Sequence, residues 1–426
     1  MPDLVRIDPP SNRRWVLGVS VSSDCSRMAA ALVTAAGQGL AMRAEVGEGI
    51  TAQLPAETSA LYHQLADPSS SLPAAAAAER LAALRHQLAE HEASLVDALL
   101  AQARRPLERI LAVGVLDPGL WTGGRGTQVG HISLCDPARL AETTGLNVVD
   151  AFPARDVARG GQGGPLTAVA QWVFLRSTQH GRLLVDLGRT ARLVWLPKQT
   201  ALPGVPNLLA FDVGPGTLML DLLAQRLTAG EQPMDPGGTL AVQGRRVPEL
   251  IDHWMSDPYF RRSLPRWHPR GVRPERFLLD AMKRAVDAGW SVRDILCTAT
   301  HFIAEAVDRA IRERLPQDLP IDEIVLTGGG QHNGLLLREA TQRLPPVPVR
   351  RIQELGISHE VLRPACAGLL ALFHLDHVPG NTPEVTGAEV SRVLGRLTPG
   401  SPQAWQRLLL EMSGNKPTLR PLRSAL

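Results

Sequence analysis

Three glycine-rich turns, at residues 160–164, 214–216 and 328–330, most constrain what this chain can fold into. The turn at 214–216 follows the hydrophobic run 208–211, which predicts a short buried strand, and precedes TLMLDLLAQRL, whose apolar residues recur at helical spacing. The turn at 328–330 separates a predicted strand in IDEIVLT from another helix. Because strand–turn–helix units recur along the chain, an α/β fold is predicted.

The remaining pattern agrees with that class. We expect a strand at 15–23 with a hairpin partner at 28–35, a long helix at 73–106, a buried strand at 110–116 and a hairpin over 182–197. Helices are expected at 239–257, 278–314 and 359–375. A chain of 426 residues is too long for one compact core. We therefore expect a first domain over 1–147, joined by a terminal helix at 401–414, and a second over 148–400.

Charge and cysteine usage exclude several classes of protein. The net charge is only +3 and no dense Lys/Arg block is present, which argues against a nucleic-acid partner. The four cysteines lie far apart without a CxxC pair, so neither a zinc site nor a disulfide framework is indicated, and we interpret them as core residues. The N-terminus lacks the apolar region of a secretory signal, and no run is long enough to span a membrane. We expect a cytoplasmic protein with no membrane partner.

Asp212 is the most informative single residue, because it lies where a predicted strand ends and a turn leads into a helix. A carboxylate there can cap the helix or form the turn. It can also act as a catalytic base, since α/β folds place their ligands at the carboxyl ends of strands. The sequence around it leaves both interpretations open.

The glycine turns indicate a phosphorylated ligand. Glycine lets backbone N–H groups approach an anion, and a following helix N-terminus favours negative charge. No GxxxxGK[ST] motif occurs, and no GxGxxG opens a helix after a first strand. A P-loop and a dinucleotide fold are therefore not indicated.

Four segments together carry a specific resemblance: ARDVARGGQGGPL (154–166), FDVGPGTLMLD (211–221), LTGGGQHNGLLL (326–337) and VPGNTPEVTGA (378–388). In order and spacing they resemble the anhydro-N-acetylmuramic acid kinase family of the sugar kinase/Hsp70/actin superfamily. The resemblance implies a two-domain, ribonuclease H-like fold with ATP and Mg²⁺ in a cleft. It also implies the family's reaction in cell-wall recycling, in which water opens the 1,6-anhydro ring and the freed 6-oxygen takes the γ-phosphoryl of ATP. A homodimer is a further expectation from the family.

The resemblance also implies residue roles. Asp212 matches the catalytic base that activates water. The implied sugar-side residues are Arg155, Asp156, Gly160 and Gly161. The implied nucleotide-side residues are Ser22, Ser23, Gly188, Gly214, Gly216, Gly328, Gly329 and Gly330. No residue is assigned to a metal.

Other positions depart from the family pattern. In SVSSDCSRMA (20–29), Ser22 stands where the family has glycine, Arg27 replaces another glycine, and the two family aspartates are lost. Fewer carboxylates leave fewer oxygen ligands for Mg²⁺. Asp24 lies two residues early, and strand alternation predicts that it points to the opposite face. In DLGRTAR (186–192), Arg189 and Arg192 replace Gly and Asn, and on a later helix Arg363 replaces Glu.

Three hypotheses follow from this mixture. An active kinase would keep Asp212 accessible in the cleft and use Arg27, Arg189 and Arg192 as new phosphate contacts. A non-catalytic relative acting as a binding or regulatory protein would have its cleft filled by Arg27 or Arg363. A kinase for a different sugar would share the first arrangement but not its substrate.

Overall fold

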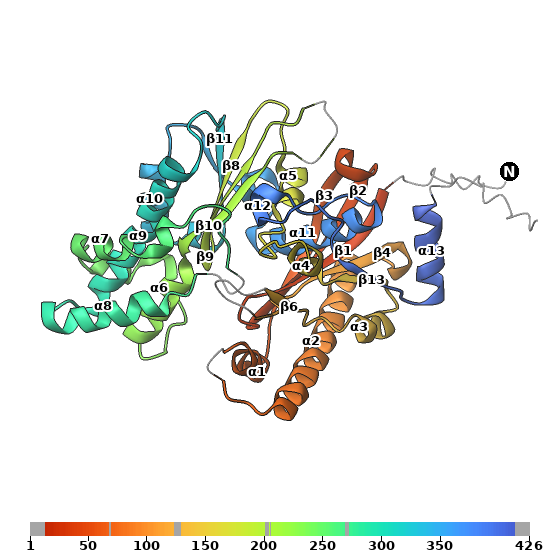
Figure 1. Ribbon diagram of the computed structural model, residues 1–426, viewed down its shortest axis with the longest axis horizontal. Helices are drawn as coiled ribbons and strands as arrows, with labels where there is room; N and C mark the ends of the chain where they lie inside the picture. Colours follow the sequence, from red (N-terminus) through yellow and green to blue (C-terminus); the bar gives the residue numbers. More distant parts are fainter. Residues whose placement is uncertain are drawn as a thin grey trace, which may run out of the picture.

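The computed structural model describes residues 13–67, 70–122, 129–200, 204, 206–268 and 272–413. Its architecture is two large β-sheets, with helices around and between them, and a small two-stranded sheet (Figure 1). The last residue of the expected terminal helix lies outside these residues. The first sheet has the strand order β13-β7-β4-β1-β2-β3. Its strands are β1 (Arg13–Val21), β2 (Arg27–Ala36), β3 (Arg43–Gln53), β4 (Ile110–Leu116), β7 (Val148–Asp150) and β13 (Arg396–Thr398).

The second sheet repeats the arrangement of the first. Its order is β10-β9-β8-β11-β12, formed by β8 (Arg182–Leu187), β9 (Thr190–Leu196), β10 (Leu209–Pro215), β11 (Glu323–Thr327) and β12 (Val349–Arg351). In both sheets three antiparallel strands are followed by two parallel ones, added on the side of the first strand. This duplicated α/β topology is the predicted sugar kinase/Hsp70/actin-like fold, and both expected hairpins are confirmed.

Helix α11 (His359–Leu375) lies directly on the first sheet because glycine removes the side chains between them. A Cβ on Gly18 would come within 1.8 Å of the Pro364 carbonyl oxygen, and one on Gly114 within 2.1 Å of the Ala367 carbonyl oxygen. On the other face, α2 (Ala74–Ala103) covers the sheet, so all seven residues of β4 are buried. Parallel strands covered on both faces are hydrophobic throughout, as β4 is.

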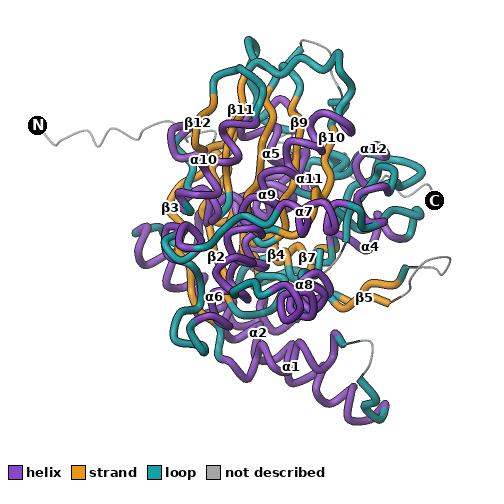
Figure 2. Tube along the Cα trace, turned by 90° about the vertical axis from the view of Figure 1, so that its left-hand side faces the viewer, coloured by secondary structure: helices purple, strands orange, loops and turns teal. Residues whose placement is uncertain are grey.

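The core around α11 is shared by both sheets. Helices α11 and α5 (Ala168–Leu175) lie in the middle of the molecule (Figure 1). Their cluster includes Val16 and Ala31 from the first sheet and Leu184 and Val194 from the second. In Figure 2, strands β9 to β12 lie above β2, β4 and β7, with α1 and α2 at the bottom.

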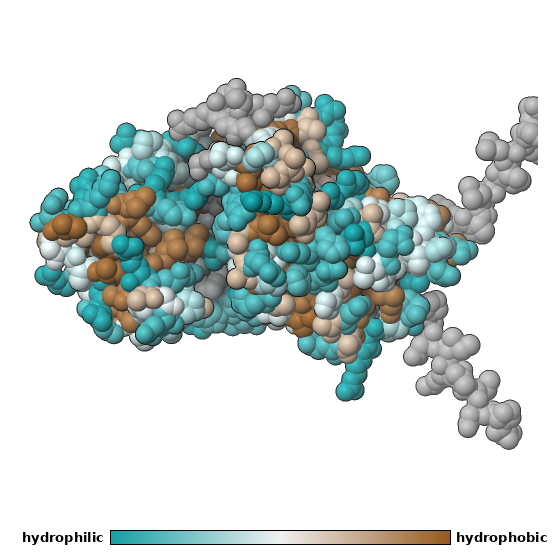
Figure 3. Space-filling model, turned by 90° about the horizontal axis from the view of Figure 1, so that it is seen from below, coloured by the Kyte–Doolittle hydropathy of each residue, from teal (hydrophilic) through white to brown (hydrophobic). Residues whose placement is uncertain are grey.

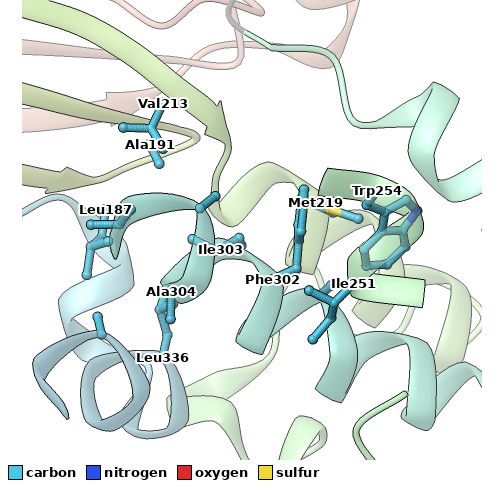
Figure 4. Packing of buried hydrophobic residues seen from close by; sticks show 14 of the residues in the cluster. Leu187, Ala191, Val213, Met219, Ile251, Trp254, Phe302, Ile303, Ala304 and Leu336 are labelled. Carbon is cyan, nitrogen blue, oxygen red and sulfur yellow. The ribbon is translucent and has the colours of Figure 1, made fainter. Parts of the chain in front are cut away.

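A second core fills the outer side of the second sheet. Helix α9 (Val292–Arg314) is central to it, and its Phe302, Ile303 and Ala304 point toward the residues of neighbouring elements (Figure 4). Around α9 pack α6 (Thr217–Leu227), α7 (Pro248–Met255) and α10 (Gly334–Arg343). The remaining elements are α1 (Ala56–Ala66), β5 (Leu120–Thr122), β6 (Gly130–Ile132), α3 (Pro137–Thr144), α4 (Phe152–Val157), α8 (Glu275–Ala288), α12 (Pro383–Thr386), α13 (Pro402–Met412) and short 3₁₀ turns.

Two expected helices are shorter than predicted. The stretch expected to be helical at 278–314 is broken into α8 and α9, because Gly289 adopts φ +68° after α8 and Ser291 begins α9 with a capping box that includes Asp294. In the segment expected to be helical over 239–257, only α7 is an α-helix. It begins at Pro248, a residue well suited to a first helical position.

The surface and cysteines agree with a folded core. Seen from below, apolar groups gather at the end of the molecule where α6 and α8 lie (Figure 3). Leu279 and Val286 of α8 are exposed. All four cysteines are buried and free, as expected. Within the described part of the chain, no helix has the length and apolar character needed to cross a bilayer.

Candidate functional site

Two of the three glycine-rich turns, 214–216 and 328–330, meet Gly188 at one edge of the second sheet, whereas the third, 160–164, follows helix α4 and not a strand. Strands β8, β10 and β11 run in the same direction, so their carboxyl ends lie together, and Gly188, Gly216 and Gly328 follow them directly. A Cβ on Gly216 would lie 2.1 Å from the Gly188 carbonyl oxygen, and one on Gly328 2.5 Å from the Gly188 nitrogen. Glycine is needed here because backbone packs on backbone.

The triple-glycine turn leaves one open position. A Cβ on Gly329 would meet no atom within 4 Å, whereas one on Gly330 would meet Leu187. After the turn, Asn333 caps α10 by accepting a hydrogen bond from the Leu336 nitrogen at 3.0 Å. Gly329 is thus the place in this turn where a ligand can approach the backbone.

Asp212 does not follow the end of a strand as predicted, because β10 continues through it to Pro215. It is fully buried, with an exposed fraction of 0%. Arg192, its neighbour across the β9–β10 pair, donates from Nε and Nη2 to its Oδ1 at 2.9 and 2.8 Å. The backbone nitrogen of His268 donates to Oδ2 at 3.2 Å. Both carboxylate oxygens are therefore engaged, and the expectation of an accessible Asp212 is not met in this structure, because Arg192 and the loop at 266–268 cover it.

Arg192 is held as a cation. Burial by itself lowers the pKa of its guanidinium, but the carboxylates of Asp212 and Asp186 outweigh burial and raise the pKa above its ordinary value. Its side chain is nevertheless 22% exposed. Arg192 thus lies between the buried carboxylate and solvent.

Two residues that sequence reasoning missed fix the backbone of Asp212. Arg266 donates from Nε to the Asp212 carbonyl oxygen at 2.8 Å, and the Tyr259 hydroxyl donates to the same oxygen at 3.0 Å. The Asp212 nitrogen in turn donates to the Arg266 carbonyl oxygen at 2.8 Å. Burial lowers the pKa of Arg266 and raises that of Tyr259. Nothing in the local pattern around Arg266 distinguishes it from its neighbouring arginines.

Asp24 occupies a different position from the one expected. Strand β1 ends at Val21 and β2 begins at Arg27, so Asp24 lies in the turn between them and the alternation of strand faces does not apply. Its Oδ1 accepts hydrogen bonds from the hydroxyls of Ser22 and Ser26 at 2.7 and 2.8 Å. Ser23 lies beside it in the same turn.

The turn of Asp24 touches the turn between β8 and β9. Arg189 Nη2 lies 2.8 Å from Asp24 Oδ2. Burial raises the pKa of Asp24, but Arg189 and the two serine hydroxyls outweigh burial and lower it. Nearby on α6, burial raises the pKa of Asp221 to about 6 despite the opposing charges of Arg189 and Arg27. Arg27 itself is exposed.

The loop implied to lie on the sugar side is organised by Asp156. This buried carboxylate accepts hydrogen bonds from the Gly163 nitrogen at 2.8 Å, the Asn381 amide at 2.5 Å and the Thr386 hydroxyl at 2.6 Å. A Cβ on Gly161 would lie 2.1 Å from the same carboxylate. Asp156 therefore holds the loop 160–164 against the segment 381–386.

The other residues of that loop have more open surroundings. Gly160 adopts φ +77° and a Cβ on it would meet no atom within 4 Å. Arg155 is exposed. Gly163 and Gly164 pack against the rings of Trp121 and Trp267, whose centroids lie 5.3 Å apart.

Arg363 lies between the two halves of the molecule. It is exposed, and it has no ion pair within the described ranges. Although part of the residue reaches the surface, the protein atoms packed around its guanidinium lower the pKa of that group and so does Arg192, whereas Asp117 and Asp186 act in the opposite sense. The guanidinium thus lies among charged groups of the second sheet and of the loop after β4. Asp117 is itself engaged by its own loop, through Gly119, Ser133 and Leu134.

The donors at this edge suit a polyanion better than a metal. Serine hydroxyls, the guanidinium of Arg189 and the open backbone at Gly329 are groups that bind phosphate oxygens. Over the residues that the structure describes, no group of three or more His, Cys, Asp or Glu side chains is placed to hold a metal ion. A pocket of about 200 Å³ beside α13, lined by Arg14, Asp376 and Glu411, lies among other residues.

Comparison with known proteins identifies the family. The family model for anhydro-N-acetylmuramic acid kinase matches residues 30–400, beginning just after the turn that holds Asp24. The anhydro-N-acetylmuramic acid kinase of Gloeobacter violaceus is 36% identical over 273 residues, 63% of this chain and 69% of that protein. That of Salinibacter ruber is 31% identical over 324 residues, 72% and 80% of the two chains.

Similarity to solved structures is weaker. A gluconate kinase from Lactobacillus acidophilus aligns over 94% of this chain and 97% of its own, with 9% identity and a TM-score of 0.43. The match of the family model over most of the chain is decisive. This chain belongs to the anhydro-N-acetylmuramic acid kinase family.

Proposed function

We propose that the protein is an ATP-dependent kinase that opens 1,6-anhydro-N-acetylmuramic acid with water and phosphorylates its 6-oxygen. Family membership supports the reaction. The observation that carries the proposal is the position of Asp212 in β10, four residues before Gly216, in the strand whose carboxyl end lies beside the turns at Gly188 and Gly328. That edge is where α/β folds bind their ligands.

Asp212 is the proposed general base. In the reaction, a proton passes from water to its carboxylate as the water oxygen bonds to the anomeric carbon and the bond from that carbon to the 6-oxygen breaks. The 6-oxygen bonds to the γ-phosphorus of ATP as the bond from that phosphorus to the bridging oxygen breaks and ADP leaves, so the 6-oxygen needs no proton. Because Arg192 engages Oδ1 and a backbone nitrogen engages Oδ2, Arg192 has to withdraw before water can reach the base.

The remaining residues have binding and positioning roles in this proposal. Ser22, Ser23 and Gly188 lie on the phosphate side, and Gly214, Gly216 and Gly328 to Gly330 shape the nucleotide side. Arg155, Gly160 and Gly161 belong to the sugar loop, which Asp156 positions. Among the side chains that the structure describes, no group of three or more His, Cys, Asp or Glu is placed to hold a metal ion, and no step is assigned to Mg²⁺.

A second candidate is a non-catalytic binding or regulatory protein on the same scaffold. The complete burial of Asp212 and its pairing with Arg192 favour this candidate. Arg27 and Arg363 are both exposed, and Arg363 lies between the two sheets. The second candidate therefore rests on Arg192, which covers Asp212, and not on Arg27 or Arg363.

The test is ADP release from ATP with Mg²⁺ and 1,6-anhydro-N-acetylmuramic acid. Wild type should turn over, and Asp212→Asn should lose at least about 10²-fold in kcat because the base is gone. The control is Asp280→Asn on the surface of α8, where the aspartate pairs with Arg284 and His253. It should match wild type. If wild type and Asp212→Asn are equally inactive, the second candidate replaces the first.

A further inference from the structure

An ion pair joins two turns that belong to different sheets. Asp24 lies between β1 and β2, and Arg189 lies between β8 and β9. The distance from Arg189 Nη2 to Asp24 Oδ2 is 2.8 Å, and the side chains are 35% and 18% exposed. Water therefore reaches the pair, and the pair can exchange partners with a dissolved ion.

The carboxylate of Asp24 is bound as a phosphate group would be. Its Oδ1 accepts hydrogen bonds from the hydroxyls of Ser22 and Ser26 and from the Ser26 nitrogen, at 2.7, 2.8 and 3.2 Å. Arg189 holds the other oxygen. Hydroxyls, a backbone N–H and a guanidinium are the donors that proteins direct at phosphate oxygens. The Asp24 carboxylate thus occupies hydrogen-bond donors of the kind that bind phosphate oxygens.

The charges around the two turns balance only while the Asp24 carboxylate is present. Arg189 and Arg27 provide two cations, and Asp24 and Asp221 provide the nearby carboxyl groups. Arg189 Nε is buried without a hydrogen-bond partner, so its guanidinium has unused donor capacity. An anion with several oxygens, such as a polyphosphate, would use that capacity better than one carboxylate does.

We propose that Asp24 is an internal competitor of the nucleotide. Its carboxylate occupies the donors of Ser22, Ser26 and Arg189 and ties the two turns together until a nucleoside triphosphate displaces it. The identity of the competing anion rests on the proposed function, whereas the competition itself rests on the geometry. Asp24 therefore lowers the affinity for ATP, and Arg189 raises it once Asp24 has withdrawn.

The test measures binding without catalysis. Affinities for AMP-PNP, a non-hydrolysable ATP analogue, and for inorganic tripolyphosphate are measured by calorimetry on the full chain. Asp24→Asn keeps the size of the side chain and removes its charge, so both anions should bind about three- to tenfold more tightly. Arg189→Gln should bind both about tenfold more weakly. In the double variant, Asp24→Asn should no longer improve binding. A second substitution, Asp24→Ser, repeats the measurement if the asparagine variant folds poorly.

The matched control is Asp322→Asn, since Asp322 also pairs with a cation, Lys198 at 3.2 Å, where water reaches it. Its affinities should equal those of wild type. Unchanged or weaker binding by Asp24→Asn, or no binding of either anion by any variant, overturns the proposal. The sugar assay is separate. If Asp24→Asn binds tripolyphosphate more tightly but wild type does not phosphorylate the sugar, the competition by Asp24 is supported and the proposed kinase function is contradicted.

Discussion

At the residue scale, the pairing of Asp212 with Arg192 decides how this site can work. The two residues face each other on adjacent strands, and the carboxylate has no contact with solvent. A buried carboxylate whose partner is removed retains a charge that the interior does not stabilise. Activity at Asp212 and stability of the second sheet are therefore coupled through one guanidinium.

Arg192→Gln should lower the free energy of unfolding by about 3 kcal/mol, because it leaves Asp212 buried and unpaired. Adding Asp212→Asn to it should restore part of that loss, since the double variant has no isolated charge. Urea unfolding of the two single variants and the double variant completes the cycle. Strictly additive changes would show that the two side chains do not interact.

A pH effect is expected at Asp221. Burial raises the pKa of this carboxyl from 3.8 to about 6 in the folded chain. The folded state therefore binds the proton more tightly than the unfolded state does, and the stability contributed by Asp221 is greatest below about pH 4 and is lost as pH rises through about 6. Asp221→Asn should raise the free energy of unfolding by about 1 kcal/mol at pH 7.5, after allowance for partial exposure, and have little effect at pH 4.

Urea midpoints at the two pH values check this difference. Asp252→Asn, at an exposed position of α7, is the control and should be neutral at both. A gain of equal size at pH 4 and pH 7.5 would mean that titration of Asp221 is not its cause.

At the scale of elements, some glycines in the turns are needed for close packing of the backbone, and another leaves room for a ligand. Gly216 and Gly328 lie against the backbone of the β8–β9 turn, whereas a Cβ added to Gly329 would meet no atom within 4 Å. The same motif thus contains glycines that the fold requires and one that the fold does not.

Gly216→Ala should destabilise the protein by about 2 kcal/mol, because its Cβ would lie 2.1 Å from a carbonyl oxygen and the strands must move apart. Gly329→Ala should leave unfolding within about 0.5 kcal/mol of wild type. If nucleotide approaches Gly329, the second variant should still weaken AMP-PNP binding in calorimetry. Equal destabilisation by both variants would contradict the assignment of the open position.

At the scale of the whole molecule, α11 and its neighbours connect the two sheets. The cluster around α11 includes apolar residues of both. We propose two domains that each contain one sheet, divided near residue 147 as expected from the sequence, although β7, β13 and α11 pack with the first sheet. A shared core of this kind should prevent either half from unfolding alone.

Calorimetry of the wild-type chain should therefore show one unfolding transition, with equal calorimetric and van't Hoff enthalpies. Leu369→Ala, within the shared cluster, should shift the whole transition to lower temperature, because removal of a buried leucine side chain costs about 2–5 kcal/mol. Two resolved transitions, only one of which moves in the variant, would show that the halves are independent.

The sequence by itself determined the α/β class, the two hairpins, the long helix α2 and the family. These depend on local information: apolar periodicity, glycine at strand ends and motifs of adjacent residues. Even at this level, the break between α8 and α9 was missed, because the turn at Gly289 interrupts a pattern that otherwise continues. The amphipathic period records which face is buried but not where the backbone turns.

Only the tertiary structure decided the rest. It showed that one strand topology occurs twice, that Asp212 is covered by Arg192, and that Asp24 reaches Arg189 from a turn rather than pointing away on a strand. Each of these depends on contacts between residues distant in sequence. Each also depends on the exclusion of water by elements that come later in the chain. Charge pairing and burial are properties of that packing, so no local pattern of residues encodes them.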